Sequence, residues 1–121
     1  MRDHIYRRGD VLLVDLPFAD VARSKVRPVL VVQNDIANEV SGNSIVVAIS
    51  SRVPRRLLPV QYKVPDGSSQ ARDAGLSKSS VVDCGVIFTL AKHRLRRKIG
   101  GLPTEAMAEI DRCLEISLAL D

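Results

Sequence analysis

Two residues at the ends of apolar segments have side chains suited to binding an anionic group. Arg27 stands directly before the rigid Pro28, and Ser50 follows an apolar run that begins at Ile45. A guanidinium stays charged, and its planar fork of donors pairs two phosphate oxygens at once, so it can stabilise negative charge that grows in a transition state. A serine hydroxyl adds a neutral hydrogen bond to the same oxygens. The pair is therefore suited to phosphate chemistry.

Both residues belong to segments whose composition predicts buried strands. Residues 26–35 and 45–51 are runs of β-branched and aliphatic residues without a helical period, bounded by turn-forming and polar residues. The end of a strand holds a side chain still and leaves it open to a ligand. We therefore expect Arg27 and Ser50 to be presented by a rigid scaffold.

The rest of the chain predicts further short strands and one long helix. The helix is expected after a cap at Thr104 and Glu105, because Met107, Ile110 and Leu114 follow at helical spacing. Several short strands with one helix predict a mostly β, α+β fold, either a small coiled barrel or a strongly bent sheet with the helix on one side. The other expected elements are strands at 9–15, 58–64, 80–83 and 86–90 with a kink at 84–85, connections at 19–26 and 52–56, a polar, flexible segment at 68–75, and helical turns at 35–40, capped by Asp35, and at 91–95.

The length and composition limit the class of protein. A chain of 121 residues is long enough for one core, so we expect one domain over residues 1–121. No apolar stretch has the length needed to cross a bilayer, and no apolar run follows the charged N-terminus, which predicts a cytoplasmic protein without membrane contact. Cys84 and Cys113 lie in apolar runs without the spacing of a metal site or a disulfide framework, so we expect both to be buried and free.

The basic residues are clustered in a way that suits a phosphate backbone. The formal net charge is +4 and the sequence pI is about 9.4. Such clusters favour nucleic acid only modestly, because many basic surfaces are simply solvated. With two Tyr and two Phe in the chain, a broad platform for base stacking is not expected, so bases would be held by loops and hydrogen bonds. The clusters are Arg7-Arg8, Arg23 with Lys25 and Arg27, Arg52 with Arg55-Arg56, and residues 92–98.

Several motifs resemble one known family when they are taken in chain order. They are Gly9-Asp10, residues 27–35, Ala48-Ile49-Ser50-Ser51, residues 75–81, and Ile99-Gly100 before the terminal helix. Over nearly the whole chain, roughly Arg8 to Leu120, the sequence resembles the MazF/PemK (Kid) family of toxin endoribonucleases. The resemblance implies an SH3-like barrel of the CcdB/Kid/MazF kind, a homodimer, and a cognate antitoxin whose acidic, disordered tail covers the site. It also implies sequence-selective cleavage of single-stranded RNA (messenger, transfer or ribosomal) with neither metal nor other cofactor, which inhibits translation and growth.

The resemblance also assigns roles to particular residues. Arg27 and Ser50 align with the catalytic Arg and Thr of the MazF branch, and Ser51 is the alternative hydroxyl. In this reaction the ribose 2′-hydroxyl attacks the adjacent phosphorus and leaves a 2′,3′-cyclic phosphate and a 5′-hydroxyl. Contacts with RNA are expected from Phe18, Lys25, Ser51 and Arg52.

The chain departs from the family pattern at residues 85–89. The family commonly has an acidic residue or Gln there, followed by Arg-Thr, whereas this chain has Phe88 in place of the Arg. The acid/base pair of the Kid branch would fall on Asp83 and Gly85, so it cannot be carried over. His4 and His93 lie outside the motifs, and we expect proton transfer through water or an arginine of lowered pKa.

Two other functions remain open. One is a non-enzymatic inhibitor like CcdB, which binds DNA gyrase through the end of its helix. The other is a member of the family that binds RNA without cutting it, a possibility that Phe88 keeps open. A purely structural role for the site residues is also open: Arg27 covers a barrel edge or pairs with Asp15 or Asp35, and the serines satisfy their own backbone.

Overall fold

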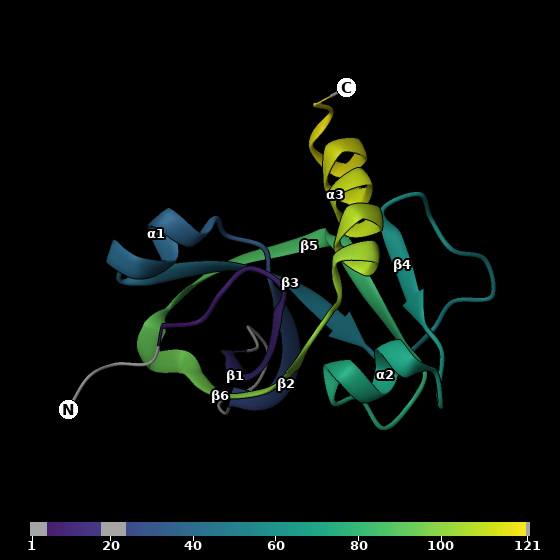
Figure 1. The fold of residues 1–121 in the computed structure, drawn as a ribbon, viewed down its shortest axis with the longest axis horizontal. Helices are drawn as coiled ribbons and strands as arrows, with labels where there is room; N and C mark the ends of the chain where they lie inside the picture. The colour runs from purple at the N-terminus through teal and green to yellow at the C-terminus, as the bar shows by residue number, and fades with distance from the viewer. Residues whose placement is uncertain (1–4, 18–23, 121) are drawn as a thin grey trace.

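The computed structural model describes residues 5–17 and 24–120, whose strands form one bent antiparallel sheet (Figure 1). The strand order is β4-β5-β3-β2-β1-β6, so β4 and β6 are the edges of the described sheet. A mostly β fold with a long C-terminal helix confirms the predicted fold class. The strands are β1 (Asp10–Pro17), β2 (Ser24–Val31), β3 (Asn43–Ser50), β4 (Gln61–Val64), β5 (Ser80–Ala91) and β6 (Leu95–Gly101). The helices are α1 (Asp35–Val40), α2 (Ser69–Ala74), the 3₁₀ turn η1 (Lys92–Arg94) and α3 (Thr104–Leu118).

Strand alternation divides the apolar residues between the two faces of the sheet. Successive residues of a strand point to opposite faces, and residues paired across strands share a face. The first face, which we call the helix-covered face, carries Val11, Leu30 and Val47 in register and packs against apolar residues of α2 and α3. The second, the groove face, carries a separate cluster: Leu12, Val14, Leu16, Val29, Val31, Val46, Leu90 and Leu95.

Helix α3 closes the helix-covered face (Figure 1). Its buried residues Ala106, Ile110 and Cys113 recur at helical spacing. Of the predicted apolar residues, Ile110 is buried, and Met107 and Leu114 are partly buried against the core. Arg8 ties the start of the chain to this helix, because its Nη2 donates to Asp111 Oδ1 at 2.7 Å. The predicted cap is wrong: Pro103 occupies the N-cap position without a side-chain hydrogen bond, and Thr104 is already helical.

The polar segment expected to be flexible at 68–75 instead contains α2. Ser68 Oγ accepts a hydrogen bond from Ala71 N at 3.1 Å, which caps the first turn. Gly75 ends the helix in the left-handed conformation (φ +72°), and Leu76 N donates to Ala71 O at 2.9 Å. Two buried alanines, Ala71 and Ala74, give the helix its apolar side. This side is too short to produce a recognisable period in the sequence.

Several predicted boundaries and one cap also differ from the structure. β1 continues through Pro17, β4 begins only at Gln61, and 80–91 is one strand rather than two. Helix α1 is capped by Asn34, whose Oδ1 accepts from Ala37 N at 2.8 Å, and not by Asp35. The Asp35 carboxylate accepts from Arg8 N and Asn38 Nδ2, and these hydrogen bonds lower its pKa.

The two cysteines are buried and free, as predicted. Burial raises the pKa of the Cys84 thiol to about 12 and also raises the pKa of Cys113. Both thiols therefore stay protonated at neutral pH and pack as small apolar groups. In the described part of the chain, no helix is both long and apolar enough to span a membrane.

Candidate active site

The register of the sheet places Arg27 and Ser50 on the groove face. Val29 on β2 pairs with Ala48 on β3, so their side chains share a face. Arg27 lies two residues before Val29, and Ser50 lies two residues after Ala48. A two-residue step keeps a side chain on the same face of a strand, and β2 and β3 run antiparallel. Arg27 and Ser50 therefore project from neighbouring strands at the same end of the groove face.

An open pocket of about 420 Å³ lies at this end of the sheet, and both residues line it. It also contains Ser51 and Arg52, so four of the six predicted site residues come together. Phe18 lies outside the described residues, as does the side chain of Lys25, whose backbone pairs with Leu16. The complete lining is Leu16, Arg27, Pro28, Ala48, Ile49, Ser50, Ser51, Arg52, Leu76, Ser77, Lys78, Ser80 and Phe88.

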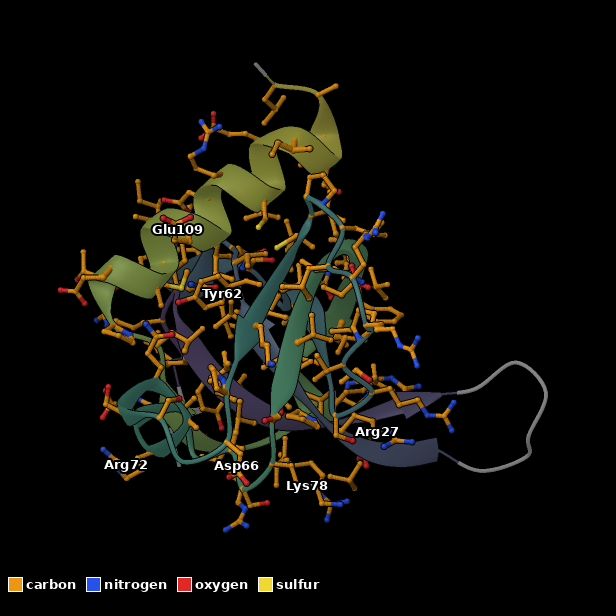
Figure 2. All side chains as sticks on the ribbon, turned by 90° about the vertical axis from the view of Figure 1, so that its right-hand side faces the viewer. Arg27, Tyr62, Asp66, Arg72, Lys78 and Glu109 are labelled. Carbon is orange, nitrogen blue, oxygen red and sulfur yellow. The ribbon has the colours of Figure 1, made fainter. Side chains whose placement is uncertain are left out.

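The pocket is cationic. Arg27, Arg52 and Lys78 are all exposed in it, and Figure 2 shows Arg27 and Lys78 at the end of the sheet away from α3. Neither Asp nor Glu is among the described residues that line it. Within the described chain, the side chains of these three cations form no hydrogen bond or ion pair. The charges are therefore available to an anionic ligand.

The carboxylates that could have neutralised Arg27 are engaged elsewhere. Asp15 Oδ1 accepts from Arg96 Nη1 at 3.2 Å, and Asp35 accepts from Arg8 N at 2.8 Å. The expectation that Arg27 merely pairs with one of them is not met in the described structure.

Ser50 uses one side of its hydroxyl to shape the end of its strand. Its Oγ accepts a hydrogen bond from Arg52 N at 3.1 Å, in a local turn that serine commonly makes where a strand ends. A hydroxyl also carries one proton to donate, and the Ser50 side chain is only half-buried. The same residue can therefore fix the turn that leads to Arg52 and donate a hydrogen bond into the pocket.

Ser77, Lys78 and Phe88 are three of the nine lining residues that were not predicted as site residues. Ser77 and Lys78 follow α2, and because this helix was not predicted, the position of their loop could not be inferred. Phe88 follows an irregularity in β5 that hides its face from a simple alternation rule. Residues 75–81 belong to a family motif and Phe88 departs from the family pattern, but neither residue type nor spacing assigned these side chains to the pocket.

Other titratable candidates lie away from the pocket. Asp83 Oδ1 accepts from Gly85 N at 2.9 Å and its Oδ2 accepts from Gln61 Nε2 at 3.2 Å, so this carboxylate holds the backbone of β5. His93 is exposed on η1 and is not part of the pocket lining, and His4 lies outside the described residues. In residues 5–17 and 24–120, no three or more His, Cys, Asp or Glu side chains form a group suited to a metal ion.

A bent antiparallel sheet with an open cationic pocket on one face suits a small protein that binds a phosphate-bearing polymer. Residues 7–118 match the family described as PemK-like, MazF-like toxin of type II toxin-antitoxin system. The chain belongs to this family.

Individual relatives agree with this assignment. The chain is 40% identical over 117 residues to endoribonuclease EndoA of Bacillus subtilis (strain 168), covering 96% of this chain and 97% of that protein. It is similar to an endoribonuclease solved in complex with its cognate antitoxin from a mycobacterial species, with TM-score 0.75, 25% identity, and 96% and 97% of the two chains covered. It is also similar to the Mycobacterium tuberculosis toxin MazF-mt6, with TM-score 0.75, 25% identity, and 93% and 98% covered.

Proposed function

We propose that this protein is the toxin of a type II toxin-antitoxin system and acts as a sequence-selective, metal-independent endoribonuclease on single-stranded RNA. Its action inhibits translation and growth in the cytoplasm. The toxin works as a homodimer, and a cognate antitoxin with an acidic, disordered tail covers the site. The strongest support is that Arg27 and Ser50 line one open, cationic pocket. Family membership and 40% identity to an endoribonuclease support the same reaction.

In the proposed reaction, a ribose 2′-hydroxyl attacks the adjacent phosphorus and the 5′-oxygen of the next nucleotide leaves. Arg27 donates from its planar fork to the non-bridging oxygens, where negative charge increases as the phosphorane forms. Ser50 donates its hydroxyl proton to one of these oxygens in a neutral hydrogen bond. The products are a 2′,3′-cyclic phosphate and a 5′-hydroxyl.

The remaining pocket residues hold the strand on either side of the cut. Arg52 and Lys78 attract the neighbouring phosphates, and Ser51 offers a second hydroxyl close to Ser50. We assign both proton transfers to water, since neither a histidine nor a carboxylate is among the described lining residues. The chain therefore contributes mainly position and charge, and a modest acceleration is enough for a toxin that needs few cuts per transcript.

The proposal is tested by incubating the purified protein with single-stranded RNA in EDTA. We expect cleavage with cyclic-phosphate and 5′-hydroxyl ends, and its loss in Arg27→Ala. Arg97→Ala removes the same charge from an exposed position outside the pocket, so it should cut normally. Binding without cleavage by the parent protein would identify an RNA-binding member of the family instead, and full activity in Arg27→Ala would refute the site.

A further inference from the structure

Among the described residues that line the pocket, one has an aromatic side chain, and this residue is Phe88. It is partly buried, packs against the apolar cluster of the groove face, and also lines the pocket. The core thus holds the ring in place without covering it. A fixed, partly exposed aromatic ring inside a cationic pocket has no evident role in binding phosphate, because it has no charge and no donor.

An irregularity in β5 turns Phe88 toward the groove. On β3, Ala48 pairs with Asp83 and its neighbour Val47 pairs with Ile87, which leaves the three residues 84–86 without partners on β3. An odd number of extra residues reverses which side chains face each side of the sheet. Before the irregularity, odd-numbered Asp83 shares a face with Ala48; after it, even-numbered Phe88 shares a face with Val46.

The backbone of this irregular segment is firmly held. Cys84 N donates to Val60 O at 2.9 Å, and Ser117 Oγ of α3 donates to Cys84 O at 2.7 Å. Gly85 N donates to Asp83 Oδ1 at 2.9 Å. Three hydrogen bonds therefore fix the segment that orients Phe88, and its direction is built into the fold.

The position of Phe88 along the sheet separates it from the phosphate proposed to react. Its partner Val46 lies four residues from Ser50 on β3, which is roughly 13 Å at the rise of a strand. The ring is therefore too far along the strand to contact the oxygens held by Ser50.

We propose that Phe88 stacks on one nucleobase of the RNA beside the cleaved phosphodiester bond and so helps to position the strand. This inference rests on the function proposed above and adds a base contact to the phosphate contacts of Arg27, Arg52 and Lys78. Every base has a π-face, so stacking on one ring strengthens binding by about 10-fold without strict sequence selection. Purines, which have the larger face, should be preferred at the stacked position.

The test uses an oligonucleotide centred on a cleavage site mapped with the parent protein, with a 2′-deoxy nucleotide at the cut to prevent the reaction. Affinity is measured by fluorescence anisotropy for the parent, Phe88→Leu and Phe88→Tyr. We expect Leu to weaken binding about 10-fold and Tyr to change it by less than about 2-fold, because only Tyr keeps the ring. Thermal unfolding of each variant shows whether the groove-face cluster tolerates the change.

A set of abasic oligonucleotides then identifies the stacked base. One abasic position should weaken binding to the parent about 10-fold and leave binding to Phe88→Leu nearly unchanged. The reason is that the missing base and the Phe88→Leu substitution each remove the same stacking contact. The proposal would be overturned if Phe88→Leu bound RNA as tightly as the parent. It would also be overturned if every abasic position weakened binding to Phe88→Leu as much as binding to the parent. Either result would leave Arg27-dependent cleavage in place. A parent protein that neither binds nor cuts RNA would overturn the proposed function as well. If Phe88→Leu weakened only an acidic antitoxin peptide, Phe88 would be a protein contact instead.

Discussion

The hydroxyl of Ser50 combines two roles that are usually considered alternatives. It accepts a hydrogen bond from Arg52 N, which is the structural role, and its proton remains able to donate into the pocket. Arg27 differs because its guanidinium has no partner within the described chain. At the residue scale, the proposed catalytic pair therefore consists of the unpaired guanidinium of Arg27 and the Ser50 hydroxyl, whose proton is free to be donated.

Removing the Ser50 hydroxyl tests its proposed catalytic role. We expect Ser50→Ala to lower kcat for RNA cleavage by about 10- to 100-fold, since one donor to the developing charge is lost. Ser41→Ala is a matched control, because Ser41 Oγ accepts from Asn43 N at the same 3.1 Å in an exposed turn outside the pocket. Both variants should keep their unfolding free energy within about 0.5 kcal/mol. Equal cleavage by the two variants would reduce Ser50 to its structural role.

At the scale of elements, the sequence predicts what depends on long apolar patterns. The strands around Val29 and Val47, and helix α3 with Ile110, follow from β-branched runs and a helical period. Ser50 ends β3 as predicted, whereas Arg27 lies inside β2 and not at its end. Both residues still belong to predicted strands, so the core of the site could also be predicted. Helix α2 could not, since its six residues are stabilised by the cap at Ser68 and by contacts with distant β6.

Two glycines show how closely α2 approaches β6. A Cβ on Gly75 would lie 2.2 Å from Ile99 O, and one on Gly100 would lie 2.3 Å from Asp73 O. Backbone meets backbone at both positions, so no side chain can move aside. This approach anchors the loop that carries Lys78 into the pocket.

Gly75→Ala should therefore destabilise the protein by more than about 3 kcal/mol, because it adds a backbone clash to the cost of a left-handed residue. Gly67 has a similar φ of +75° but nothing within 4 Å of its Cβ position. Gly67→Ala should thus show the conformational cost alone, about 1 kcal/mol. Denaturant unfolding measures both, with Gly42→Ala as a neutral control in open space. Similar losses in Gly75→Ala and Gly67→Ala would contradict the close approach.

At the scale of the whole molecule, the positive charge is not uniformly available. On β6, Arg96 and Lys98 form ion pairs with Asp15 and Asp10 of β1. In the pocket, by contrast, the described cations have no acidic neighbour in the lining. The net charge of +4 predicts attraction to polyanions only in general, and strand register decides where it is effective.

The difference between the ion-paired cations of β6 and the unpaired cations of the pocket should appear in the salt dependence of RNA binding. Each phosphate contact on a single strand contributes about 0.7 to the slope of log affinity against log salt concentration. We expect Lys78→Gln to reduce the magnitude of the slope by about that amount. Lys63→Gln removes an equal charge from an exposed position on β4 outside the pocket and should leave the slope unchanged. Equal slopes for the two variants would show that Lys78 does not contact the strand.

Residues 84–86 of β5, which have no partners on β3, also restrict how this segment can change in length during evolution. A deletion or insertion of one residue there would exchange the two sides of the strand, directing Ile87 and Thr89 into the groove and Phe88 and Leu90 out of it. A change of two residues would preserve the facing of every later side chain. Gaps in an alignment of related toxins should therefore occur here in pairs, whatever residues fill the segment.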